Sequence, residues 1–102
     1  MDRIKERLAR ARDRYKEKLI QHLDELEELL RAGRASVDAL EQAQRLAHKI
    51  YGSAGTFGFK GVSEAIGAID RDLLGVLSGQ LQAAPELWRR VEQRMLKAHE
   101  LG

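Results

Sequence analysis

Apolar residues recur at every third or fourth position along nearly the whole chain of 102 residues. This spacing matches the 3.6-residue period of an amphipathic helix, which turns one apolar stripe toward a protein core. The sequence contains no extended run in which apolar and polar residues alternate, as they would in a half-buried strand. The pattern therefore predicts an all-α protein whose helices each bury one stripe.

Glycine residues mark the ends of the first three apolar stripes. The first stripe runs to Gly33, and a glycine suits the C′ position that follows a helix. The second stripe stops at Gly58, and the third ends near Gly79. We expect Gly58 and Gly61 to be turn residues with positive φ, which glycine adopts without strain. These positions divide the chain into helices that are separated by short linkers.

Capping signals indicate where the second and fourth helices begin. Ser36 stands where an N-cap is wanted, and Asp38 follows in the first turn, near the positive end of the helix dipole. Pro85 suits the first turn of the fourth helix because its missing N–H needs no partner there. Short linkers make consecutive helices antiparallel neighbours. The sequence thus predicts an up-and-down antiparallel four-helix bundle.

The length of the chain allows one domain over residues 1–102, because two separate cores would each be too small. The bundle is expected over about residues 15–101. Residues 1–14 exceed what the bundle needs and form a basic N-terminal extension, which either continues the first helix or lies across the end of the bundle. Residues 1–18 hold eight basic and four acidic side chains, a net charge of +4, so the rest of the chain carries −2.

Composition excludes several classes of function. The chain has no cysteine, which removes disulfides, thiolate nucleophiles and zinc ribbons. A net charge of only +2 argues against a nucleic-acid partner. No apolar run approaches the roughly 20 residues that a bilayer span needs, so no membrane partner is expected. We expect a cytoplasmic protein that holds no metal or cofactor of its own.

One of the three histidines, His48, has unusual neighbours. On a helical wheel it lies roughly 130° from the centre of the second apolar stripe, so it should point into solvent. Gly52 and Gly55 follow one and two turns later on the same face, and each interior glycine costs about 0.5–1 kcal/mol relative to alanine. The two glycines therefore lower the stability of the helix and leave the surface beside the imidazole open. His22 and His99 lack such neighbours and are expected to be solvated surface residues.

The chemistry of an exposed imidazole favours phosphoryl transfer. Near neutral pH the ring is mostly an unprotonated nucleophile, and a phosphoryl group needs positioning more than covalent help. If one ring nitrogen attacks, the other must carry the proton, and a carboxylate on a neighbouring helix would fix that tautomer. Asp70, on the flank of the third stripe, is our candidate for this carboxylate. Glu64 is the alternative candidate for this carboxylate.

The residues that follow His48 resemble those of a known family. The run from His48 to Phe59, with the sequence HKIYGSAGTFGF, resembles the phosphorylation-site helix and following turn of histidine phosphotransfer (HPt) domains. Its last part, from Gly55 onward, is similar to the variety that opens chemotaxis-type histidine kinases. The four-helix layout over about residues 14–101 also fits. The resemblance implies a phosphocarrier in two-component signalling that has no ATP site of its own.

The resemblance also implies partners and residue roles. In this family the exposed histidine accepts a phosphoryl group from a histidine kinase or a receiver-domain aspartate and passes it to another receiver aspartate, with Mg²⁺ held by the receiver. By resemblance His48 is this phosphoacceptor, and Asp70 falls where the chemotaxis-type domains place a glutamate that hydrogen-bonds the histidine. Aspartate is one methylene shorter, so the contact is either direct or bridged by water.

The chain departs from the family at the third residue after the histidine, which is usually basic. Here that residue is Tyr51, and Lys49 or Arg45 are the candidates to take over its role toward the phosphate. We expect a set of residues that face the phosphate or the partner: Gln44, Arg45, Lys49, Tyr51, Gly52 and Gly55.

Two functions of other classes compete with this interpretation. The chain could be a helical interaction module that binds a partner through its basic N-terminal helix, with His48 incidental. An enzyme that uses His48 as a general base is less favoured because no nucleophile or metal constellation accompanies it. Nucleotide binding by the segment from Gly52 to Gly58 is rejected, since the segment lacks the phosphate-loop spacing and a preceding strand.

Overall fold

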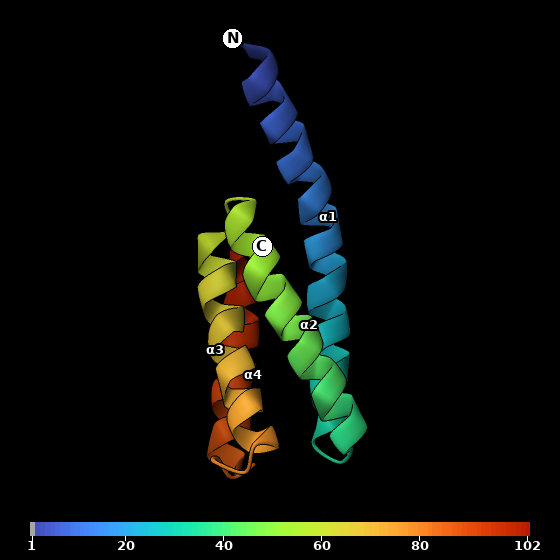
Figure 1. Ribbon diagram of the computed structural model, residues 1–102, viewed down its shortest axis with the longest axis vertical. Coiled ribbons are helices and arrows are strands. Elements are labelled where there is room, and N and C mark those ends of the chain that lie inside the picture. Colours follow the sequence, from blue (N-terminus) through green and yellow to red (C-terminus); the bar gives the residue numbers. More distant parts are fainter. Residues whose placement is uncertain (1) are drawn as a thin grey trace.

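Four helices in up-and-down order make up the protein, whose computed structural model describes residues 2–102, with side chains from residue 3 onward. They are α1 (Asp2–Gly33), α2 (Val37–Thr56), α3 (Lys60–Leu77) and α4 (Pro85–Leu101). Consecutive helices run antiparallel, and the start of α1 extends well beyond the other three (Figure 1). The described residues contain no strand. The predicted all-α four-helix bundle is confirmed.

The core is built from the predicted apolar stripes. α2 packs against α1 and α3, and α3 packs against α4, whereas α1 and α4 meet over a smaller area. The stripe of α2 is rich in alanine, which allows its backbone to lie close to both neighbours. The fully buried large side chains, each of which contributes about 1.5–3 kcal/mol by its burial, are Leu19, Leu23, Leu26, Ile50, Val62, Ile66, Ile69, Leu73 and Val91.

Most of the predicted helix ends are confirmed. The Ser36 hydroxyl accepts a hydrogen bond from the Ala39 amide (3.3 Å) and caps α2. Gly58 and Gly79 have φ of 86° and 81°, so both occupy the left-handed region that glycine favours. Pro85 is the first residue of α4.

Two expectations about glycines are wrong. Gly61 has no positive φ and lies inside α3, where a Cβ atom would approach Leu101 Cδ1 to 2.7 Å. Gly33 is the last residue of α1 rather than a left-handed residue beyond it. A Cβ there would lie 3.3 Å from the Leu40 Cα atom. Both glycines therefore serve the close packing of neighbouring segments rather than a turn.

The basic N-terminal segment continues α1 as one unbroken helix, which decides between the two alternatives left by the sequence. From Arg3 to Arg14 every side chain is exposed except the half-buried Ala11. The first buried residue is Tyr15, whose ring stacks on that of Phe57 at 4.3 Å between centroids. The Tyr15 hydroxyl lies 2.8 Å from Ser53 Oγ. This contact joins α1 to the end of α2 and marks the end of the bundle.

Within the described residues, no helix is both long and apolar enough to cross a membrane.

Candidate functional site

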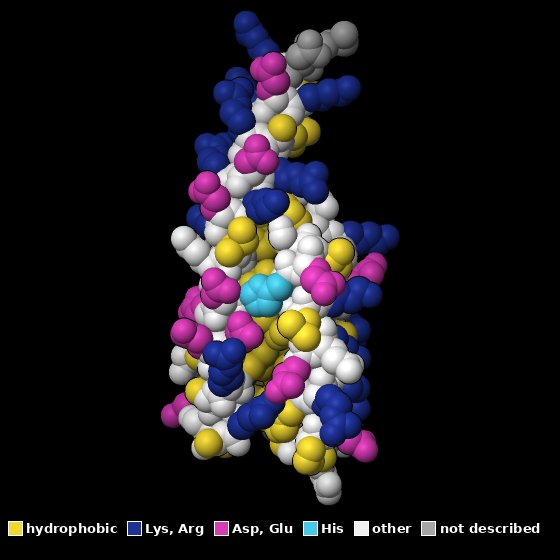
Figure 2. Space-filling model, turned by 180° about the vertical axis from the view of Figure 1, so that it is seen from behind, with side chains coloured by type: hydrophobic (Ala, Val, Ile, Leu, Met, Phe, Trp, Pro, Cys, Tyr) yellow, Lys and Arg dark blue, Asp and Glu magenta, His cyan; other side chains and the backbone are white. Residues whose placement is uncertain are grey.

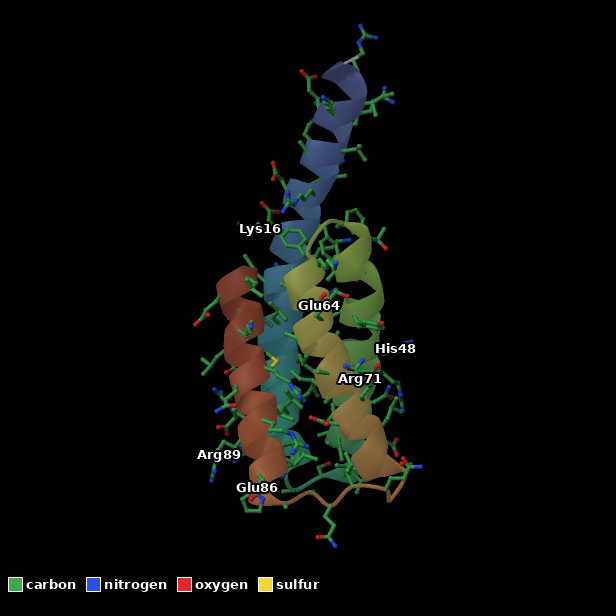
Figure 3. The ribbon with its side chains drawn as sticks, turned by 90° about the vertical axis from the view of Figure 1, so that its left-hand side faces the viewer. Lys16, His48, Glu64, Arg71, Glu86 and Arg89 are labelled. Atoms are coloured by element: carbon green, nitrogen blue, oxygen red, sulfur yellow. The ribbon has the colours of Figure 1, made fainter. Side chains whose placement is uncertain are left out.

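His48 lies on the outer face of α2 and points away from the bundle (Figure 3). Its side chain is 69% exposed, whereas its helix neighbours Ala47 and Ile50 are fully buried in the core. The helical period thus places the imidazole opposite the stripe that holds α2 in the bundle. The ring is accessible to another protein, as the sequence predicted.

Asp70 reaches His48 directly from α3. Its Oδ2 atom lies 3.0 Å from His48 Nδ1, and its side chain is only 7% exposed. The shorter aspartate needs no bridging water, because the contact is already at hydrogen-bond distance. A carboxylate only accepts hydrogen bonds, so Nδ1 must carry the proton. In the neutral ring, His48 Nε2 is then the nitrogen with a free lone pair.

Gln44 completes a chain of three side chains between α2 and α3. Its amide Nε2 donates to the second oxygen of Asp70, Oδ1, at 2.9 Å. Both oxygens of the buried carboxylate are therefore bonded, as a buried polar group requires. The sequence placed Gln44 on the helix face that meets phosphate or partner, and its bond to Asp70 gives it a contact that sequence reasoning missed. Its position one turn before His48 was the available signal.

The surface beyond His48 is open at Gly52. A Cβ atom added there would find no other atom within 4 Å. Gly55 differs, because its Cβ would lie 3.3 Å from Ser63 Oγ on α3. The Ser63 hydroxyl in turn donates to the Tyr51 carbonyl at 2.8 Å. Gly52 thus leaves clear space on the surface, while Gly55 also allows α3 to pack closely.

Tyr51 covers a glycine of α3 that sequence reasoning missed. A Cβ on Gly67 would come within 2.6 Å of Tyr51 Cδ1, so the ring rests where a side chain at position 67 would otherwise stand. The centroids of the Tyr51 and His48 rings are 6.5 Å apart, and Tyr51 is 42% exposed. A glycine in the interior of a helix was the available signal, because it costs stability unless something approaches closely.

The remaining candidates of the sequence analysis stand around the site at the surface. Arg45 and Lys49 are exposed on α2, and Arg45 pairs with Glu41 one turn earlier at 3.5 Å. Glu64, the substitute for Asp70, is exposed on α3. Among the described residues, Asp70 is the only carboxylate that pairs with His48.

The other two histidines are less exposed than expected. His22 is half-buried. His99 Nε2 is shielded from solvent and lies 3.6 Å from a carboxylate oxygen of Glu27, so the expectation that His99 is solvated is wrong. The reason is its place at the end of α4, where that helix meets α1. Neither histidine combines an exposed nitrogen with a buried carboxylate.

In this four-helix bundle the exposed His48 imidazole is held at its Nδ1 atom by Asp70 from α3, and position 52, one turn later, carries no side chain. In the comparison with protein families, the Hpt domain model matches residues 10–100. The chain belongs to the Hpt domain family. No curated protein and no solved structure gives a significant match. Membership makes the chain a phosphotransfer carrier in two-component signalling, a class that works with histidine kinases and receiver domains.

Proposed function

We propose that His48 is the phosphoacceptor of a cytoplasmic phosphorelay carrier that has no ATP site of its own. His48 takes a phosphoryl group from a histidine kinase or from the aspartyl phosphate of a receiver domain and passes it to a receiver aspartate. The observation that carries this proposal is that the Nδ1 atom of His48 is held by buried Asp70, while the side chain that carries Nε2 is 69% exposed.

In the forward step, the Nε2 lone pair attacks the phosphorus of the aspartyl phosphate. The N–P bond forms as the P–O bond to the aspartate breaks, and the aspartate leaves as a carboxylate. The ring gains positive charge, which Asp70 Oδ2 stabilises through the Nδ1–H bond. In the return step a receiver carboxylate oxygen attacks phosphorus and the N–P bond breaks. The chain needs no metal for these roles, and Mg²⁺ on the receiver would neutralise the phosphoryl oxygens.

The surroundings of His48 suit the approach of a receiver domain. The missing side chain at Gly52 lets a partner backbone come close to the ring. Arg45 and Lys49 place positive charge on the same helix, where it can attract the phosphoryl oxygens. Tyr51 stands in the position of the usual basic residue and offers a hydroxyl. These residues form the proposed contact set together with Gln44 and Gly55.

The alternative, an interaction module in which His48 is incidental, does not account for the buried part of the site. Burying Asp70 removes a carboxylate from water, and this cost is offset only because Gln44 and His48 occupy its two oxygens. If His48 were incidental, nothing would require a buried carboxylate that is bonded to both Gln44 and His48. The protruding N-terminal helix is compatible with both functions.

The test is a phosphorylation assay with His48→Gln. A phosphorylated receiver domain with Mg²⁺ should label the wild-type chain with acid-labile, alkali-stable phosphate, and His48→Gln should lose this label while its circular dichroism spectrum stays helical. His22→Gln is the matched control, because it removes a histidine from α1 and should leave labelling intact. Retention of the label in His48→Gln would overturn the proposal.

A further inference from the structure

The exposed start of α1 carries an apolar seam whose two large residues, Ile4 and Leu8, are uncovered in the described part of the chain. We call residues 3–14 the arm. Ile4, Leu8 and Ala11 follow one another at steps of four and three, and the next step of four leads to Tyr15, where the stripe enters the core. Ile4 is 69% and Leu8 66% exposed. The steps of three and four are those of the a and d positions of a coiled coil.

Basic residues line both edges of this seam. With Ile4 and Ala11 at d positions and Leu8 at an a position, all four adjoining e and g positions are basic: Lys5, Arg7, Arg12 and Arg14. The acidic residues Glu6 and Asp13 fall at f positions, on the far side of the helix. Figure 2 shows Lys and Arg side chains projecting from both sides of the arm. Basic residues therefore lie beside the seam, and the acidic residues Glu6 and Asp13 lie on the opposite side of the helix.

The pattern of apolar and basic residues distinguishes between three possible binding partners of the seam. A second copy of the arm would bring like charges together along both edges, which disfavours self-association. A lipid surface requires a broad apolar face, commonly with aromatic residues, whereas the arm offers a narrow seam with two large apolar side chains. A partner helix edged by Asp and Glu would cover the apolar residues and meet every basic edge residue with an opposite charge.

We propose that the arm is a docking helix for a helical segment of a partner protein that presents an apolar seam edged by Asp and Glu. The partner helix lies along Ile4, Leu8 and Ala11 as in a short coiled coil. At the base of this surface the arm contacts the bundle, because the Arg12 guanidinium lies 4.9 Å from the centroid of the Phe59 ring. The docking surface does not involve His48, so it adds to phosphotransfer rather than explaining it.

The test is an NMR titration of the full, isotopically labelled chain with a synthetic three-heptad peptide. The peptide carries Leu at a and d and Glu at e and g, and the Glu edges keep it from pairing with itself. We expect chemical-shift changes confined to residues 4–15, and none with a peptide of the same seam edged by Lys. No response to the Glu-edged peptide, or an equal response to the Lys-edged one, would overturn the proposal.

Two double variants separate seam recognition from general charge. Lys5→Glu with Arg7→Glu reverses two edge residues and should weaken peptide binding about tenfold or more. Arg3→Glu with Arg10→Glu makes the same change of net charge at c positions, away from the seam, and should retain most of the affinity. Both variants should be labelled at His48 like the wild type, so this result is independent of the phosphocarrier proposal. Equal losses in the two variants would overturn seam recognition.

Two further measurements decide between the occupants. Vesicles of phosphatidylcholine with phosphatidylserine should bind the chain more weakly than the Glu-edged peptide does, and sedimentation should show a monomer. Vesicle binding that exceeds peptide binding would replace the helix partner with a membrane. A dimer that Leu8→Ser dissociates would replace it with a second copy of the chain.

Discussion

At the scale of single residues, the site depends on how a buried carboxylate is satisfied. The period of α2 predicted that His48 faces solvent, because exposure follows directly from its angle to the apolar stripe. The sequence also suggested Asp70 as a partner, although an isolated aspartate beside Ile69 is usually a solvated helix residue. Its burial and its bond to Gln44 depend on the register between α2 and α3. The register between these two helices cannot be read from a single sequence.

The first prediction concerns Asp70→Asn. An asparagine presents one accepting oxygen and one donating NH₂ group to Gln44 and His48, so Nδ1 can face a donor and the proton then moves to Nε2. We expect the rate of labelling by a phosphorylated receiver to fall roughly 10- to 100-fold, while the helical content is retained. The ring tautomer is read from the nitrogen chemical shifts of His48, and the rate from single-turnover labelling.

Glu64→Gln serves as the control for this prediction. It neutralises an exposed carboxylate on the same helix and should change neither the tautomer nor the rate. If Asp70→Asn kept the Nδ1–H tautomer and the wild-type rate, Asp70 would have no positioning role.

At the scale of helices, the sequence predicts where a helix begins and ends better than it predicts which residues of different helices contact each other. Ser36 sets the start of α2 through a local hydrogen bond, and Pro85 sets the start of α4 through its fixed φ. Both effects depend only on residues that are close together in the sequence. Gly61 and Gly67 lie inside α3 and mark places where Leu101 and Tyr51 come close. Such contacts join residues far apart in the sequence. Local rules therefore misassigned Gly61 to a turn and missed Gly67 altogether.

The second prediction tests the contact between α2 and α3 with Gly67→Ala. The new Cβ would lie 2.6 Å from Tyr51 Cδ1, and the Tyr51 backbone is held by Ser63, so the ring must move. We expect the free energy of unfolding to fall by about 1–3 kcal/mol, as in other overpacked sites. In a Tyr51→Ala background the same substitution should cost much less. Chemical denaturation of the four proteins gives this cycle.

Gly52→Ala is the matched control for Gly67→Ala. It makes the same chemical change at a helical glycine, but no atom lies within 4 Å of the new Cβ. It should raise the free energy of unfolding by about 0.5–1 kcal/mol through helix propensity alone. A loss of stability at Gly52, or an unchanged stability at Gly67 with Tyr51 present, would contradict the packing argument.

At the scale of the whole molecule, the bundle and the arm share one helix but differ in what surrounds them. The apolar stripe of α1 passes from Leu19 through Tyr15 to Leu8 without a break. The sequence could not decide whether the segment before Tyr15 crosses the end of the bundle, because its local pattern is helical in either case. In the structure this segment continues α1 beyond the bundle, since Phe57 and Phe59 close the end of the bundle against Tyr15.

The third prediction follows from this separation and concerns a chain that begins at residue 14. The deleted residues carry no buried side chain among those described, so the free energy of unfolding should change by less than about 1 kcal/mol. Labelling of His48 by a phosphorylated receiver should proceed as in the full chain, because Asp70, Gln44 and Gly52 all belong to α2 and α3. Chemical denaturation and the labelling assay measure the two properties on one preparation. A folded but unlabelled product would show that receiver docking extends onto the arm, and an unfolded one would show that the arm belongs to the bundle after all.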